Sequence, residues 1–353
     1  MKKIITLLLL LSLLAAAPAG LALTTIDPAA DRGISPARGL PNNPVIPGES
    51  MTTGLPFDGT YVPVLVNIDN VAGAWPQWGI AQADIIYEMP IHSHTLTRLM
   101  ALFTHDHPQE AGPLRSGRVL HAEMRQEWGA AWAFAGIQRK DGSNVNVALR
   151  EMGVRDTEDH LIFDVNTRDH TRLSINRKHH KAPHNHSFQL GQAAELVKGH
   201  AFPARPFLFD DALPTAGDAA ISIRLLYGGG NENSYTNSEY RYDAATNLYT
   251  RTRQGKPYVD MNEPETPLTF SNVIVQWANL TFNGAANAPL LEEVGEGNAD
   301  IFLGGRHISG YWVRETVDSR TVFYDQDGNE IRLQRGKTWI NITSPKSTVV
   351  IYE

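Results

Sequence analysis

The sequence predicts an α/β fold for the first half of the folded chain and a β-rich fold for the second half. In the first half, apolar runs that suit buried strands alternate with segments of helical pattern. This alternation is typical of a mixed sheet with flanking helices. In the second half, short alternating apolar and polar segments are separated by turns rich in Gly, Asn and Asp, as in hairpins. The change falls at about residue 205.

The first half is expected to alternate strands and helices. Ser187 can cap its last helix and Gly199 can end it. Ile85 and Ile86 could belong to a helical turn or open a strand. We expect strands at 63–69, 97–104 and 130–137, one or two helical turns at 79–87, and helices at 116–128, 144–152 and 187–198.

The second half is expected to consist of strands and hairpins. Asp327-Gly328 has the composition of a tight hairpin turn between two apolar segments. We expect single strands at 221–226, 272–277, 338–342 and 348–352, and hairpins at 240–251 and 321–333.

The N-terminus has the three parts of a secretory signal peptide. Lys2 and Lys3 precede an apolar run at 4–17, and small residues follow it. We expect cleavage after Ala22, with a retained membrane anchor as the alternative, and an exported, extracytoplasmic protein. Six prolines and no apolar periodicity in the next segment predict a flexible tether. The predicted organisation is a signal peptide at 1–22, a Pro-rich linker at 23–60, an α/β domain at 61–205 and a β-rich domain at 206–353.

Composition limits the classes of function. The 353 residues are 42% apolar and 20% charged, as in globular proteins rather than disordered ones. A formal net charge of −7 without a basic stripe argues against a nucleic-acid partner but leaves room for a local basic pocket. The chain has no cysteine, which excludes disulfides, thiol nucleophiles and lipid attachment through a cysteine.

The segment at 111–118 carries the clearest functional signal. Its Gly-Pro turn is followed by Arg115, Ser116 and Arg118 where a helical pattern begins, and Arg98 lies on an upstream strand. Free N–H groups at a helix start and guanidinium forks both suit carboxylate or phosphate oxygens, which predicts an anion clamp. The alternative is that these arginines pair with surface carboxylates. Ser116 is expected to cap the helix, because no Gly-x-Ser-x-Gly elbow surrounds it.

A basic, histidine-rich loop follows at about 168–186. Of 13 histidines, 12 lie between His92 and His200, so histidine chemistry would belong to the first half. We expect His184, Asn185 and Arg172 to close over the anion. Pairs at 92/94, 105/107 and 184/186 could bind zinc, but no further ligand has a diagnostic spacing, so no zinc site is predicted.

Three carboxylates follow strand-like segments in the same half. Asp69 ends a predicted strand, and Asp84 and Glu88 lie in the next apolar run. Together they could hold a divalent cation such as Mg²⁺ and the phosphate that it bridges. The alternative is that Asp69 caps a turn and that Asp84 or Glu88 pairs with Arg98.

The chain resembles the YerB-like lipoproteins, a bacterial envelope family with N- and C-terminal domains of unknown function. The resemblance spans roughly residues 60–350 and implies an N-terminal α/β domain followed by a β-rich domain, but no reaction. The family often has a lipid-modified cysteine after its signal, which this sequence lacks. The resemblance rests on Pro63-Val-Leu-Val-Asn-Ile-Asp-Asn70, Pro76-Gln-Trp-Gly79, Ala83-Asp-Ile-Ile-Tyr-Glu88, Leu96-Thr-Arg98, Gly112-Pro-Leu-Arg-Ser116 with Arg118, Ala182-Pro-His-Asn185, Asn272-Val-Ile-Val275 and Gly336-Lys-Thr-Trp-Ile340.

Three functions stay open on this basis. The first is an envelope protein that binds an anionic ligand, phosphorylated or carboxylated, in an Arg/His-lined pocket of the N-terminal domain. The second is a magnesium-dependent phosphotransferase, since Asp84 and the arginine motifs resemble the LytR-CpsA-Psr enzymes that move glycopolymers from polyprenyl pyrophosphate. The third is an interaction scaffold that offers a sheet edge of the second half to an envelope partner.

Overall fold

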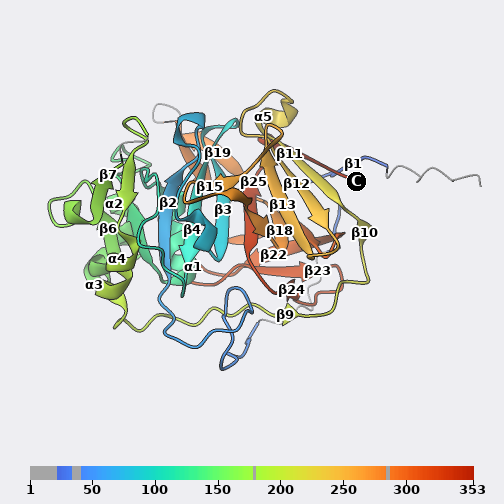
Figure 1. The fold of residues 1–353 in the computed structure, drawn as a ribbon, viewed down its shortest axis with the longest axis horizontal. Coiled ribbons are helices and arrows are strands. Elements are labelled where there is room, and N and C mark those ends of the chain that lie inside the picture. The colour runs from blue at the N-terminus through green and yellow to red at the C-terminus, as the bar shows by residue number, and fades with distance from the viewer. Residues whose placement is uncertain (1–21, 34–40, 178–179, 284–286) are drawn as a thin grey trace, which may run out of the picture.

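The computed structural model describes residues 22–33, 41–177, 180–283 and 287–353. Its largest element is a mixed sheet, to which both halves of the chain contribute (Figure 1). In the described residues this sheet has eleven strands, in the order β10-β22-β21-β18-β25-β3-β4-β2-β5-β6, with β23 paired to β22. Their bounds are β2 (Val64–Asp69), β3 (Ile85–Ser93), β4 (Leu96–Phe103), β5 (Ala131–Phe134), β6 (Ile162–Asp164), β10 (Asp218–Ala219), β18 (Asn272–Trp277), β21 (Gly295–Leu303), β22 (Arg306–Arg314), β23 (Val322–Asp325) and β25 (Thr338–Thr343).

A second sheet is built mostly from the second half of the chain. Its order is β1-β26-β11-β12-β13-β14, with β17 paired to β13. Strand β1, from near the N-terminus, pairs antiparallel with the C-terminal strand β26, so residues far apart in the sequence lie side by side (Figure 1). The bounds are β1 (Thr24–Thr25), β11 (Ser222–Leu226), β12 (Ser238–Asp243), β13 (Leu248–Arg253), β14 (Lys256–Pro257), β17 (Thr269–Phe270) and β26 (Thr348–Tyr352).

Helices and short strand pairs complete the molecule. The helices are α1 (Val119–Trp128), α2 (Val145–Glu151), α3 (Val154–Thr157), α4 (Leu190–Val197) and α5 (Tyr227–Gly230), with 3₁₀ turns η1 (Ala72–Ala74), η2 (Ile80–Gln82), η3 (Asp159–Leu161) and η4 (Thr171–Leu173). The short pairs are β7 (Ser174–Asn176) with β8 (His186–Phe188), β9 (Phe209–Asp210) with β24 (Leu333–Gln334), β15 (Val259–Asp260) with β16 (Glu263–Pro267), and β19 (Leu280–Asn283) with β20 (Ala288–Leu291).

The centre of the large sheet is buried on both faces. Val64, Val66 and Ile68 of β2 face an apolar cluster that includes residues of the second sheet. Leu65, between them, faces a second cluster that includes Trp128 of α1. Side chains alternate across a strand, so two covered faces require apolar residues at consecutive positions, and this accounts for the unbroken apolar run of β2.

The two halves of the chain join through β3 and β25. These strands pair in parallel, with Ile85 opposite Thr338 and Glu88 opposite Asn341. The junction also contains a buried ion pair between Glu88 and Arg251 of β13, at 3.0 Å, with both side chains fully buried. Arg251 lies over the ring of Trp339, 4.2 Å from its centroid, which adds a cation–π contact from β25.

The architecture confirms the coarse fold prediction, a mixed sheet with a β-rich second half. The strands expected at 63–69, 97–104 and 130–137 are present as β2, β4 and β5, and the hairpin at 240–251 is β12 and β13. The segment at 79–87 splits into η2 and the start of β3.

One local prediction is wrong, and another is confirmed only in part. Ser187 does not cap α4: it lies in β8, where its hydroxyl donates to Glu110, and Gln189 takes the position before the helix. The expected hairpin at 321–333 forms in shortened form: Tyr324 bridges Glu330 and the Ile331 N–H donates to the Phe323 carbonyl, while Leu333 at its end pairs with Phe209 instead.

The signal-peptide prediction for 1–22 falls, apart from Ala22, outside the described residues. Within the predicted linker, Arg32 is buried and bonds Asp300 of β21 at 2.8 Å, so this segment contacts the C-terminal half. The four domain limits stay predictions. In the described part of the chain no helix is long and apolar enough to cross a membrane.

We expect Glu88→Gln to lower the free energy of unfolding by about 3 kcal/mol, because it leaves the Arg251 guanidinium buried without its counter-charge. Urea denaturation measures the change. The control is Glu239→Gln, whose carboxylate lies 3.5 Å from Arg241 on an exposed face and should change stability by less than about 1 kcal/mol. Equal effects of the two variants would contradict the structural role of the Glu88–Arg251 pair.

Candidate functional site

The site is built where β2 ends beside the start of β4. Antiparallel pairing puts Asp69 opposite Arg98, and strand alternation puts both on the face that α1 covers. Asp69 is fully buried and Arg98 is 2% exposed. An acid and a base are thus held out of water at one end of the sheet.

The Gly-Pro segment brings Arg115 to the same place. β5 pairs only with the first three residues of β2, and the Gly-Pro segment pairs with the rest of that edge. The Asp69 N–H donates to the Pro113 carbonyl, and the Arg115 N–H donates to the Asn67 carbonyl. The Arg115 Nε lies 3.0 Å from the Asp69 carboxylate. Arg98 Nη1 donates to the Ser116 carbonyl at 3.0 Å, so Ser116 contributes its backbone oxygen to the cluster.

Arg118 and His121 join the group at the start of α1. Arg118 occupies the N-cap position, and its N–H donates to His121 Nδ1 at 3.0 Å. The predicted Ser116 cap is therefore wrong. Since Nδ1 accepts, the neutral ring carries its proton on Nε2. Burial, with Arg98 and Arg118 nearby, holds the pKa of His121 well below its ordinary value, so the ring stays neutral.

The charges in this cluster are unbalanced. Burial lowers the pKa of Arg98 to about 9; the Asp69 charge opposes this, and Arg118 and Arg115 add to it. Burial and then Arg115 lower the pKa of Arg118 to about 10. Both side chains still carry their charge at neutral pH. Among the described residues neither Arg98 nor Arg118 has an ion-pair partner, while Asp69 pairs with Arg115 and His184.

Several buried donors of the cluster also lack an acceptor. Within the described part of the chain, the Nε atoms of Arg98 and Arg118 and the Nε2 of His121 make no hydrogen bond. Buried donors are normally paired, and each exception calls for an explanation. Three unpaired donors next to uncompensated positive charge make this cluster a candidate site for an anion.

The histidine-rich loop supplies one further member. His184 Nδ1 lies 2.7 Å from the Asp69 carboxylate, and its side chain is 23% exposed. The Asn185 carbonyl accepts from the Arg177 N–H, and its side-chain oxygen is buried without a partner. Arg172 lies exposed on η4. The structure thus brings Arg98, Arg115 and His184 around Asp69, with Arg118 near Arg98 and Arg115, and it does not join Arg172 or the Asn185 side chain to them by any described contact.

The three carboxylates expected to share a cation lie apart. The Asp84 carboxylate accepts from Thr52 and from the Thr104 N–H, at the far end of β4. Thr104 is six residues from Arg98, which is about 20 Å along a strand. Glu88 points to the opposite face of the sheet, toward Arg251. Neither Asp84 nor Glu88 pairs with Arg98, and no group of three metal-ligating side chains occurs within the described ranges.

Two histidines lie in the cluster that were not predicted to belong to the anion site. His92, at the end of β3, places its Nε2 3.3 Å from Arg118 Nη2. His121 could have been found, because a side chain three residues after an N-cap often bonds back to the cap. The sequence singled out His92 only as half of a possible zinc pair with His94 and not as a neighbour of the arginines; its φ is positive, at 56°.

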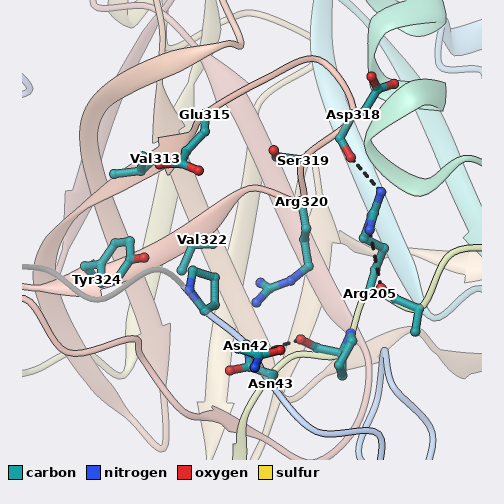
Figure 2. A pocket seen from close by; sticks show the side chains of 13 residues that line it. Asn42, Asn43, Arg205, Val313, Glu315, Asp318, Ser319, Arg320, Val322 and Tyr324 are labelled. Carbon is teal, nitrogen blue, oxygen red and sulfur yellow. Dashed lines mark hydrogen bonds between the residues drawn. The ribbon is translucent and has the colours of Figure 1, made fainter.

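The molecule also has a cavity of about 420 Å³ elsewhere, between residues 41–43, 204–206 and strands β22 and β23. Figure 2 shows Arg205 and Arg320 at its wall. Arg205 donates to the carbonyls of Glu127 and Asp318, and Arg320 pairs with Glu330 at 2.6 Å. Since these guanidinium groups already have acceptors, the cavity is a weaker candidate for an anion site than the cluster around Asp69.

Comparison with known proteins places the chain in a family. Residues 52–202 match the model described as "Protein of unknown function (DUF3048) N-terminal domain", and residues 230–340 match that of the C-terminal domain. The chain belongs to this two-domain family. It is 27% identical over 284 residues to "Putative lipoprotein YerB" of Bacillus subtilis (strain 168), covering 79% of this chain and 80% of that protein.

A solved structure has the same fold. The crystal structure of the YerB protein from Bacillus subtilis matches this chain with a TM-score of 0.70 and 24% sequence identity. The match covers 85% of this chain and 99% of that one. The similarity confirms the family resemblance and the fold.

We expect Asp69→Asn to lower the free energy of unfolding by about 3 kcal/mol, since it removes the carboxylate partner of Arg115 and His184. Sodium sulfate should recover more of this loss than sodium chloride at equal ionic strength, because a bound dianion replaces the missing charge. Thermal denaturation in both salts measures the effect. The control is Asp159→Asn, which breaks an exposed pair with Arg155. Equal recovery in the two salts would indicate simple screening.

Proposed function

We propose that this protein binds an anionic group, phosphate or carboxylate, of a bacterial envelope ligand in the cluster formed by Arg98, Arg115 and Arg118. The observation that carries the proposal is an imbalance of charge: the largely buried Arg98 and Arg118 have no ion-pair partner among the described residues, while Asp69 pairs with Arg115. Keeping unpaired charges out of water is unfavourable, and functional sites are where such arrangements occur.

The geometry of the donors supports the same ligand class. Guanidinium forks match the oxygens of phosphate and carboxylate, and His121 adds a neutral N–H donor beside them. The cluster adjoins the N-terminus of α1, whose dipole favours negative charge. Arg115 and His184 are partly exposed, which gives an anion a route from solvent.

An envelope location supports the choice of ligand. The N-terminal segment has the pattern of a secretory signal, and the relative in Bacillus subtilis is named as a lipoprotein. Phosphorylated lipids and anionic wall polymers are the anions that such a location supplies. We favour binding over phosphotransfer, because Asp69 is engaged by Arg115 and His184 while Asp84 and Glu88 lie elsewhere.

Calorimetric titration with inorganic phosphate tests the proposal. Arg118→Gln should weaken binding at least tenfold, about 1.4 kcal/mol. The free variant should be as stable as the parent protein or more stable, because the substitution removes a buried charge that has no carboxylate partner among the described residues. Gain of stability with loss of binding is what distinguishes a functional arginine from a structural one.

Arg241→Gln, an exposed substitution on β12, is the matched control and should alter neither property. The proposal fails if Arg118→Gln binds phosphate as tightly as the parent protein, or if the parent protein binds no phosphate.

A further inference from the structure

Strand β3 ends in an irregularity that directs His92 toward the cluster. The register with β4 shifts between Pro90 and Ser93, so β3 carries extra residues there. His92 adopts a left-handed φ of 56°, and its carbonyl accepts a hydrogen bond from the Asn287 side chain. A non-glycine residue in this region costs on the order of 1 kcal/mol, and such positions concentrate at functional sites.

The bulge determines what the ring of His92 contacts. Its Nε2 lies 3.3 Å from Arg118 Nη2, and the side chain is partly buried. Bulges often serve to re-aim a side chain next to a binding site. Arg118 can only donate, so the imidazole accepts at Nε2 and is neutral in the free protein.

The charged groups that face His92 come from two segments. Arg98 lies on β4, and Arg115 and Arg118 belong to the segment before α1. The other strands that contact β3 are β20 and β25, which have no charged residue. Burial, then Arg118 and Arg98, lower the pKa of His92, with a smaller effect from Arg115, while the contact with Asn287 opposes them.

We propose that His92 is a proton-linked residue of the anion site: it takes up one proton from solvent when a dianion binds, and then donates from Nε2 to an anion oxygen next to Arg118. This inference rests on the proposed function. In the free protein the Nε2 lone pair accepts from Arg118 Nη2, so protonation breaks that contact and leaves both nitrogens to donate to the anion. Protonation replaces that lone pair with a donor and adds a positive charge, so the site favours dianions, such as a phosphate monoester, over carboxylates.

The sign of the pH dependence follows from linkage. The three arginines disfavour the imidazolium in the free protein, and a bound dianion offsets their effect, so the complex holds more protons than the free protein. Affinity for a dianion should therefore rise as the pH falls between the bound and free pKa values of His92. The limit is about tenfold per pH unit for one proton.

Calorimetry with sodium sulfate at pH 7, in buffers of different ionisation enthalpy, tests this. Sulfate stays fully ionised, so any proton taken up resides on the protein. The parent protein should take up a substantial fraction of one proton per sulfate. His92→Asn should take up close to none and lose most of the pH dependence of affinity; asparagine tolerates a left-handed backbone, so the bulge is kept.

Two histidine variants serve as comparisons. His94→Asn removes a ring two residues away, whose Nδ1 contacts Ser347 at 2.7 Å and which lies outside the cluster, so it should behave as the parent protein. His184→Gln tests the imidazole beside Asp69 and should retain the uptake.

Three results would overturn the inference. The first is proton uptake in His92→Asn equal to that of the parent protein. The second is loss of proton uptake in His184→Gln rather than in His92→Asn. Sulfate binding by the parent protein without proton uptake would also overturn it, while leaving the proposed anion site intact. If the parent protein binds neither sulfate nor phosphate, the proposed function itself fails.

Discussion

Burial of the central strands on both faces is the constraint from which the rest of this structure follows. A charged side chain on such strands has no water, so it needs a partner inside the protein or a ligand. Glu88 meets this requirement through Arg251, and the pair links β3 of the first half to β13 of the second. On the opposite face, Asp69 pairs with Arg115, while Arg98 and Arg118 have no ion-pair partner, so the requirement is not met within the described residues.

The sequence carried information about this site because its charged residues interrupt otherwise apolar patterns. Arg98 lies within a run of seven residues whose other side chains, apart from Thr97, are apolar. Such a run suggests a buried strand, so its one arginine is expected to be buried as well. Arg115 and Arg118 follow a Gly-Pro turn just before a helix, where free N–H groups are expected. Local pattern therefore sufficed to nominate the arginines, and the family resemblance nominated His184.

Features that depend on tertiary pairing were not predictable in the same way. Ser187 is a residue type that often caps helices, but it lies in β8 opposite Ile175, and α4 begins three residues later at Leu190. Asp84 and Glu88 are close in sequence to Asp69 but not in space. Asp84 lies at the other end of β4, beside Thr104, and Glu88 lies on the other face of the sheet, beside Arg251. Spacing along the chain says little about such separations until the register of β3 against β4 is known.

The contrast between the cluster and the cavity shows why unpaired charge is a better guide to this site than empty volume. The cavity beside β22 and β23 is large enough for a small ligand, but its arginines are already bound to carbonyls and to Glu330. The cluster around Asp69 instead has donors without acceptors and a positive charge that the described chain does not neutralise. A ligand binds most favourably where it supplies acceptors and negative charge that the protein lacks, because the free-energy cost of bringing the arginines together is already part of folding. The uncompensated arginines and the strained His92 lower the free energy of unfolding of the free protein. Binding of an anion would raise it again, because the anion supplies the missing negative charge.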